Sequence, residues 1–250
     1  MGEADHVGNY KLTLCYDGTR YAGWQRQGNT GNTIQRKVEE TLSRILAQEI
    51  RISGCGRTDA GVHARMQVCS FHTSAPADPR ETLSSLRRYL PEDIGAVSLE
   101  EAPERFHARL SCREKTYRYR VWRSDCPNVF ERKYIYLFPE PLSLPAMREA
   151  ADALTGTHDF AAFSSVRIKK STVRTVRAIE LTENGPELTM SFTGDGFLYH
   201  MVRIMTGTLL EAGLGRKTPS DIRAALEQKD RQLAGFTAPA QGLILWDIQY

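Results

Sequence analysis

The chain has 250 residues, of which 41% are hydrophobic and 25% charged, a composition typical of soluble globular proteins. Its formal net charge of +3 is too small to indicate a nucleic-acid partner by itself. The five cysteines form no Cys-x-x-Cys pair, which argues against a disulfide scaffold or structural zinc site. Residues 1–8 lack the apolar core of a signal peptide, and no apolar run reaches membrane-spanning length, so we expect a cytoplasmic protein with no membrane partner.

The first part of the chain is predicted to fold in the order β-α-β-β-α-β. Residues 10–16 alternate as a strand does, and Thr33 can cap a helix whose apolar positions recur at helical spacing. Further strands are expected at 51–55, 67–73 and 96–101, and a second helix at 79–89. A Gly-rich loop separates the second and third strands.

The second part of the chain is predicted to repeat this α+β pattern after a junction that Pro103 opens. The expected strands are at 115–123, 134–138, 173–182, 187–193 and 243–248, and the expected helices are at 145–154, 200–210 and 219–228. Asn184-Gly185 favours a hairpin turn between the third and fourth of these strands. We therefore expect a flexible tail at 1–8 and two α+β halves, at 9–103 and 104–250, with a cleft between them.

The most informative stretch is the loop at 54–64, which we call the Asp59 loop. Its glycines let the backbone bend tightly and let a bulky ligand approach Asp59. Such a sequence is also typical of an ordinary turn in which the Asp side chain binds backbone amides. Without other information, this second interpretation is the favoured one. The glycines match no phosphate-binding fingerprint.

The same stretch, Gly54-Cys55-Gly56-Arg57-Thr58-Asp59-Ala60-Gly61-Val62-His63-Ala64, closely resembles the signature of the tRNA pseudouridine synthase A family. Similar segments continue from residue 10 to residue 250. They are Tyr16-Asp17-Gly18-Thr19, Gly23-Trp24-Gln25, Leu90-Pro91-Glu92-Asp93-Ile94, Phe106-His107-Ala108-Arg109, Lys115-Thr116-Tyr117-Arg118-Tyr119, His158-Asp159-Phe160, Thr172-Val173-Arg174-Thr175, Gly196-Phe197-Leu198-Tyr199, Met201-Val202-Arg203 and Gly242-Leu243. Met66 and Ile244 depart from the family pattern, and neither touches the chemistry.

The resemblance implies a pseudouridine synthase fold, with two ferredoxin-like halves that share a mixed, mainly antiparallel sheet and a central cleft. It also implies an isomerase that converts uridine to pseudouridine at positions 38 to 40 of the anticodon stem-loop of tRNA. The reaction moves the bond of ribose C1′ from N1 to C5 of uracil. It changes neither the composition nor the oxidation state of the nucleotide, so no cofactor or metal is expected. The six histidines form no ligand cluster.

The resemblance makes Asp59 the catalytic nucleophile. The carboxylate attacks C1′, adds to C6 of uracil or acts as a base at the ribose, and the sequence leaves these routes open. A carboxylate shielded from water needs a partner, for which we expect Arg203 in an apolar helical stretch. On such a helix Arg203 would share a face with Tyr199, His200 and Gly207. An arginine here also fits a structural role in which its stem packs and its guanidinium lies in solvent.

Tyr117 is the third residue expected to be catalytic. It shares a strand face with Tyr119 and Val121, a pattern that also fits a core tyrosine. By resemblance, its ring stacks on the target uracil and its hydroxyl helps to remove the C5 proton. Leu198 is expected among the residues that bind the substrate.

RNA binding is expected to depend on Arg57 and on two basic runs. Arg57 lies two residues before Asp59, where it fills the gap left by an extruded uridine or is simply an exposed loop arginine. Residues 105–123 hold seven basic residues against one acid, and residues 167–177 hold five with no acid. The expected RNA contacts in these runs are Phe106, His107, Ala108, Arg109, Arg167, Lys169 and Lys170. By resemblance the partner is tRNA and the protein is a homodimer.

Two other functions are compatible with the residues. A non-catalytic tRNA-binding protein or chaperone on the same fold would carry identical basic runs without needing Asp59. A hydrolase would pair Asp59 with His63 or Asp195 as acid and base and would release free uracil.

Overall fold

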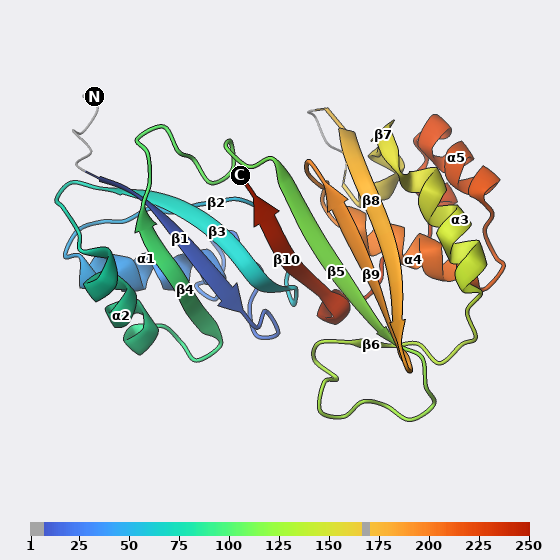
Figure 1. Cartoon of the computed structure of the whole chain (residues 1–250), viewed down its shortest axis with the longest axis horizontal. Coiled ribbons are helices and arrows are strands. Elements are labelled where there is room, and N and C mark those ends of the chain that lie inside the picture. The colour runs from blue at the N-terminus through green and yellow to red at the C-terminus, as the bar shows by residue number, and fades with distance from the viewer. Residues whose placement is uncertain (1–7, 167–170) are drawn as a thin grey trace. The chain divides into compact units, whose positions relative to one another are not determined.

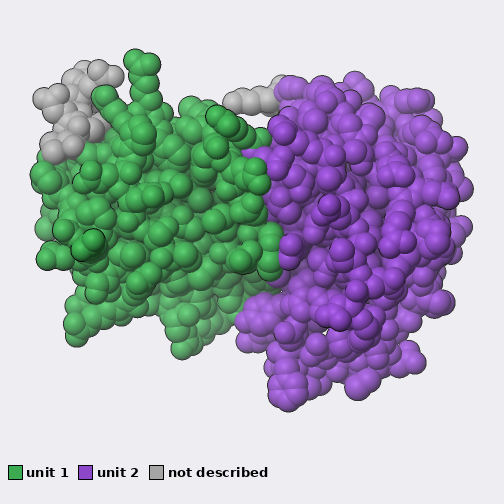
Figure 2. All heavy atoms as spheres, in the orientation of Figure 1, with its two compact units in different colours: residues 1–113, 245–250 green, residues 114–244 purple. Residues whose placement is uncertain are grey.

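The computed structural model describes residues 8–166 and 171–250, which divide into two compact units (Figure 2). Unit 1 extends to Arg113 and includes Leu245–Tyr250 from the end of the chain, and unit 2 is Glu114–Ile244. Each unit combines a sheet with helices (Figure 1). The α+β class is therefore confirmed.

Unit 1 has the strand order β4-β1-β3-β10, with the short β2 paired to β3. The strands are β1 (Gly8–Tyr16), β2 (Ser53–Gly54), β3 (His63–Thr73), β4 (Ile94–Glu101) and β10 (Leu243–Gln249). β1 is antiparallel to both β3 and β4, and β2 is antiparallel to β3. The helices α1 (Ile34–Ile45) and α2 (Pro79–Tyr89) pack against each other, and α2 also contacts β4.

The core of unit 1 follows from the two periodicities in its sequence. Leu12 and Leu14 lie on one face of β1, and Ile34, Val38 and Leu42 lie on one face of α1, and all five side chains are fully buried. Thr33 caps α1 by accepting a hydrogen bond from the Arg36 amide, as its position predicts.

Unit 2 has the strand order β5-β9-β8-β7, with β6 parallel to β5 and the other pairings antiparallel. The strands are β5 (Glu114–Trp122), β6 (Tyr136–Leu137), β7 (Gly156–Asp159), β8 (Val173–Asn184) and β9 (Glu187–Gly194). The helices are α3 (Leu144–Leu154), α4 (Met201–Gly213) and α5 (Pro219–Gln228), with single-turn helices at Ala161–Phe163, Arg231–Leu233 and Ala240–Gly242. The mixed, mainly antiparallel pairing is therefore confirmed.

The helix α4 is the most buried of unit 2. Its packing against α3 leaves Ile204, Met205 and Leu209 without solvent exposure. The chain needs little side-chain amphipathicity here because the helix is enclosed on most sides. Within the described residues, every helix is too short or too polar to cross a bilayer.

The predicted elements agree with the structure except at a few points. β7 was not predicted, because four residues with no apolar alternation carry too weak a strand pattern. α4 begins at Met201, so Tyr199 and His200 precede the helix and do not share a helical face with Arg203. Gly8, placed in the tail by the sequence analysis, begins β1. The cleft between the halves stays a prediction.

The boundary between the units lies at Arg113, ten residues beyond the junction at Pro103. The buried Asn9 side chain explains the difference, since its Nδ2 donates to the carbonyls of Pro103 and Phe106, both at 2.8 Å. The Arg113 amide donates to the carbonyl of Gln249 at 2.9 Å, which joins this segment to the end of the chain. Long-range bonds of this kind have no signature in local sequence.

Asn9→Ala should lower the free energy of unfolding by about 1–3 kcal/mol, because the part-buried hydrogen bonds to the carbonyls of Pro103 and Phe106 are lost. The measurement is urea denaturation followed by circular dichroism. The control Asn29→Ala alters an exposed asparagine and should stay within about 0.5 kcal/mol of the unmodified chain. An unchanged midpoint for Asn9→Ala would show that the segment 102–113 is held by other contacts.

Candidate active site

The Asp59 loop connects β2 to β3 in unit 1, as the sequence predicted. Cys55, Thr58 and Val62 point into the unit and are buried, whereas Arg57 is exposed and Asp59 is half-buried. The alternation places the two polar residues Arg57 and Asp59 on the outer side of a loop whose other side is part of the core. A carboxylate in this position is accessible to a ligand but is held by a rigid backbone.

The segment 16–24 and the strand β3 together fix the backbone on the two sides of Arg57. The Trp24 amide donates to the carbonyl of Thr58 at 3.0 Å, and the Thr58 Oγ1 lies 2.7 Å from the Tyr16 hydroxyl. From β3, the Gln67 Nε2 donates to the carbonyl of Gly56 at 2.8 Å. We call Tyr16, Trp24, Thr58 and Gln67 the loop clamp. Its bonds hold the residues directly before Asp59 in one conformation.

Glycine is required where the segment 16–24 touches the Asp59 loop. Gly23 has a φ of +96°, and a Cβ there would lie 2.8 Å from the Thr58 carbonyl oxygen. A Cβ on Gly18 would lie 2.0 Å from the Val62 carbonyl oxygen, a clash with backbone. The two segments therefore approach more closely than any other residue type permits.

Burial raises the pKa of the Tyr16 hydroxyl well above its usual value, although its hydrogen bonds with Thr58 and Gln67 act in the opposite direction. The hydroxyl therefore stays protonated at physiological pH. Its role in the loop clamp is to hold Thr58 by a neutral hydrogen bond, since a phenol that never ionises cannot be a general base.

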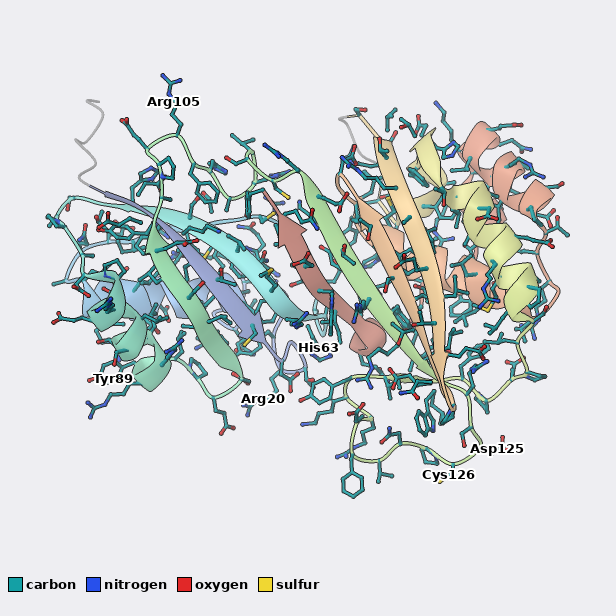
Figure 3. All side chains as sticks on the ribbon, viewed as in Figure 1. Arg20, His63, Tyr89, Arg105, Asp125 and Cys126 are labelled. Carbon is teal, nitrogen blue, oxygen red and sulfur yellow. The ribbon has the colours of Figure 1, made fainter. Side chains whose placement is uncertain are left out.

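His63 is buried at the start of β3, with 3% of its surface exposed (Figure 3). Its Nδ1 accepts a hydrogen bond from the Gly18 amide at 3.0 Å and lies 3.2 Å from the Asp17 Oδ1. His63 thus links the end of the Asp59 loop to the 16–24 segment, which favours a structural role over the acid–base role of the hydrolase reading. Asp195 lies in unit 2, where its carboxylate accepts from the Thr175 amide.

Three of the residues expected to be catalytic or to bind the substrate lie in unit 2. Tyr117 is buried on β5, and its ring meets that of Phe197 edge to face at 5.3 Å between centroids. Arg203 lies in the first turn of α4, where its Nε donates to the Ala238 carbonyl at 2.7 Å. Leu198 is buried just before α4. The backbone carbonyl fixes one edge of the Arg203 guanidinium and so restricts its orientation.

The expected RNA contacts at 106–109 lie in unit 1 and differ in accessibility. Arg109 is exposed, and the His107 Nδ1 accepts from the Arg109 amide at 3.1 Å. Phe106 packs against Tyr250 at 5.0 Å between ring centroids. The side chain of Ala108 is fully buried, and its amide and carbonyl bind Ser70 and Tyr250. Ala108 therefore anchors the segment, and a direct RNA contact by its side chain is not compatible with this burial.

The basic run at 105–123 is less available than its sequence suggests. Arg120 forms a charge pair with Glu187 at 2.6 Å and binds Glu131, and Arg123 pairs with Glu183 at 2.6 Å. Arg105 and Arg109 are exposed, and Arg105 extends away from the surface of unit 1 (Figure 3). The other expected contacts, Arg167, Lys169 and Lys170, lie outside the described residues.

One part of this site, the support of the Asp59 loop, was missed by sequence analysis. The segments Tyr16-Asp17-Gly18-Thr19 and Gly23-Trp24-Gln25 were noted only for their family resemblance, although Gly18, Gly23 and Trp24 in one short loop were a usable indication of close backbone contact. In residues 8–166 and 171–250, no group of three or more His, Cys, Asp or Glu side chains has the arrangement needed to hold a metal ion.

Comparison with known proteins adds independent information. A family model described as tRNA pseudouridine synthase matches residues 14–110 and 150–250. The chain is 45% identical over 245 residues to a tRNA pseudouridine synthase A of Bacillus sp. (strain KSM-64), which spans 98% of this chain and 100% of that protein. It is 45% identical over 243 residues to tRNA pseudouridine synthase A 1 of Clostridium tetani, spanning 97% and 99%. An Exiguobacterium sp. protein named tRNA pseudouridine synthase A is 44% identical over 241 residues, spanning 96% and 97%.

Gly23→Ala should destabilise the protein by about 1–3 kcal/mol, the range for a residue forced into an unfavourable backbone conformation. The matched control is Gly28→Ala, because a Cβ at Gly28 meets no atom within 4 Å and its φ is not positive. Urea denaturation of both variants measures the effect. Equal stability of the two variants would mean that the 16–24 segment yields without cost, and so does not hold the Asp59 loop.

Proposed function

The chain belongs to the tRNA pseudouridine synthase family, and from that membership we propose that it isomerises uridine to pseudouridine in tRNA with Asp59 as its nucleophile. The reaction breaks the bond between ribose C1′ and uracil N1, forms a bond between C1′ and C5, and moves a proton from C5 to N1. Substrate and product have the same atoms and the same oxidation state. The structural observation that best supports this assignment of Asp59 is its half-buried carboxylate on a loop whose backbone is clamped on the core side.

The loop clamp supports the choice of Asp59 within unit 1. A nucleophile needs a fixed distance and angle to its target, and a misplacement of about 1 Å can cost about a hundredfold in rate. The Trp24 and Tyr16 contacts to Thr58 fix the residue before Asp59. The proposal holds for each of the three routes, attack at C1′, addition at C6 or proton abstraction, since all need an ionised carboxylate beside the sugar.

We assign supporting roles to Arg203 and Tyr117. A guanidinium keeps a carboxylate ionised in a site closed to water, and the bond from Arg203 Nε to Ala238 orients that group. Tyr117 supplies a buried ring to stack on the target uracil and a hydroxyl for the C5 proton. Its edge-to-face contact with Phe197 fixes the ring plane. Leu198 is proposed to line the base-binding pocket.

RNA recognition is proposed to involve Arg57, Phe106, His107, Arg109, Arg167, Lys169 and Lys170. A uridine within a stem must be extruded before its C1′ can be reached, and Arg57, exposed beside Asp59, is suited to occupying the vacated space. Phosphate contacts by the arginines and lysines supply most of the affinity. We propose the anticodon stem-loop, positions 38 to 40, as the target. Activity at neighbouring positions requires recognition of RNA shape more than of bases.

We further propose, from the family resemblance, that the protein acts as a homodimer in the cytoplasm. The predicted absence of disulfides fits a reducing compartment. Sedimentation equilibrium of the full chain, with and without tRNA, measures the oligomeric state directly.

Asp59→Asn should abolish pseudouridine formation while leaving tRNA binding intact. An amide is neither a nucleophile nor a base, so the rate should fall by on the order of 10⁴-fold or more, as when other enzymes lose a nucleophile. The assay is tritium release from tRNA labelled at uracil C5, with sequencing to locate the product. Filter binding supplies the control, because the substitution should change the Kd for tRNA by no more than about twofold.

The outcomes separate the competing functions. Tritium release at the normal rate by Asp59→Asn would remove Asp59 from the mechanism. Tight tRNA binding without tritium release by the unmodified chain would indicate a non-catalytic RNA-binding protein. Free uracil in the product mixture would indicate a hydrolase.

Tyr117→Phe should separate the two roles of this tyrosine. Phenylalanine keeps the ring that stacks on the base and packs on Phe197, so the KM for tRNA should change little. Loss of the hydroxyl should lower kcat by about 10²-fold or more, the usual contribution of a general acid or base. Steady-state kinetics gives both constants, and an unchanged kcat would exclude the hydroxyl from proton transfer.

A further inference from the structure

A pair of stacked aromatic rings lies directly before α4 in unit 2. The rings of Tyr199 and His200 are 3.9 Å apart between centroids and inclined by 23°. Tyr199 is 48% exposed, although large apolar side chains on most of this unit are buried. A flat aromatic surface that faces solvent is the group that proteins use to stack on an unpaired base.

The imidazole of this pair is held in place. Its Nδ1 lies 2.8 Å from the Ser165 Oγ, which fixes the ring plane on which Tyr199 stacks. Both rings are therefore oriented before any ligand arrives. A pre-oriented aromatic surface loses little conformational entropy on binding, which favours affinity.

The backbone conformation of His200 also indicates that this aromatic pair has a functional role. Three non-glycine residues in the described ranges have positive φ, and two of them, Ala47 and Lys229, lie at helix C-terminal ends, where this conformation is common. His200, with a φ of +62°, lies at the N-terminal end of α4 and makes no capping bond with its side chain. His200 therefore holds a strained backbone conformation directly after the exposed Tyr199, and its side chain does not cap the helix.

An arginine covers the chain shortly before the aromatic pair. A Cβ on Gly196 would lie 3.7 Å from the Cδ and Nε of Arg174, so the Arg174 side chain passes over Gly196, three residues before Tyr199. Exposed aromatic rings match a nucleotide, whose base can stack on them. A protein partner would more often be met by a larger apolar patch.

We propose that Tyr199 and His200 form a stacking platform for an unpaired base of the bound tRNA. This inference rests on the proposed function, because it takes tRNA as the ligand. It assigns a nucleotide-binding role to two residues that the reaction itself does not require.

The test measures the Kd of an unmodified tRNA transcript in the Asp59→Asn background, where no turnover occurs. Tyr199→Ala should weaken binding about tenfold, the scale of one lost base stack. Tyr199→Phe keeps the ring and should bind within about twofold of its parent. The matched control is Tyr89→Ala, because Tyr89 is 52% exposed but its ring face is covered by the Arg88 guanidinium 5.5 Å away. This control should not change the Kd.

Salt dependence separates stacking from charge. Log Kd plotted against log salt should keep its slope in Tyr199→Ala, since no phosphate contact is removed. His200→Gly should also weaken binding, although glycine accepts the positive φ, because the ring below Tyr199 is lost. Thermal melting of each variant confirms that it is folded.

Three results would overturn the platform. They are an unchanged Kd in Tyr199→Ala, an equal loss in Tyr199→Phe, which would indicate a hydroxyl contact, and a reduced salt slope, which would indicate a phosphate contact. Tritium release by the unmodified chain is measured on the same tRNA. If tritium is released but the Kd does not respond to Tyr199→Ala, the platform alone is rejected. If the Kd responds to Tyr199→Ala but no tritium is released, the proposed isomerase activity is rejected and the platform is retained.

Discussion

The structure of unit 1 depends most on the close contact between the segment 16–24 and the Asp59 loop. The Trp24 amide and the Tyr16 hydroxyl hold Thr58, and Gly23 lets the two backbones approach within a distance that a Cβ would prevent. A loop with three glycines would otherwise sample many conformations, which costs entropy each time a ligand requires one of them. The clamp removes that freedom in advance. A flexible-looking sequence can thus present a carboxylate in one orientation, as a nucleophile requires.

The clamp also explains why polar side chains are buried around this loop. Tyr16, Thr58, His63 and Gln67 are all buried, and each makes a hydrogen bond to the loop or to the segment that supports it. Burying such groups without partners would be costly, and an apolar substitute would free the loop backbone to move. The polar core beneath Asp59 is consistent with a region selected for the geometry of a site as well as for stability.

Most of the fold, but less of the site, could be predicted from the sequence. Thr33, Pro79 and the Asn184-Gly185 turn act through local backbone preferences, so their elements were found with nearly correct bounds. The roles of Asn9 and of the Gln249 carbonyl depend on residues about a hundred positions away, which no local pattern reports. The positions of Asp59, Tyr117 and Arg203 in the chemistry came from resemblance, since each also fits an ordinary structural role. The sequence could not distinguish Ala108 from Arg109 as expected RNA contacts. Their burial distinguishes them, because Ala108 is buried and anchors its segment, whereas Arg109 lies at the surface.

The points at which local rules fail carry the most information about function. The N-caps of the other α-helices, Thr33, Asp78, Ser143 and Thr218, are extended residues whose side chains accept amide hydrogen bonds. His200 has neither property, and Gly23 has a conformation that almost only glycine adopts. Natural sequences are locally consistent where only stability matters, so departures tend to lie where a site needs a particular geometry. Gly23 supports Asp59, and His200 stands three residues before Arg203. The two departures from local preference thus adjoin the two residues of opposite charge to which the proposed reaction assigns the central roles.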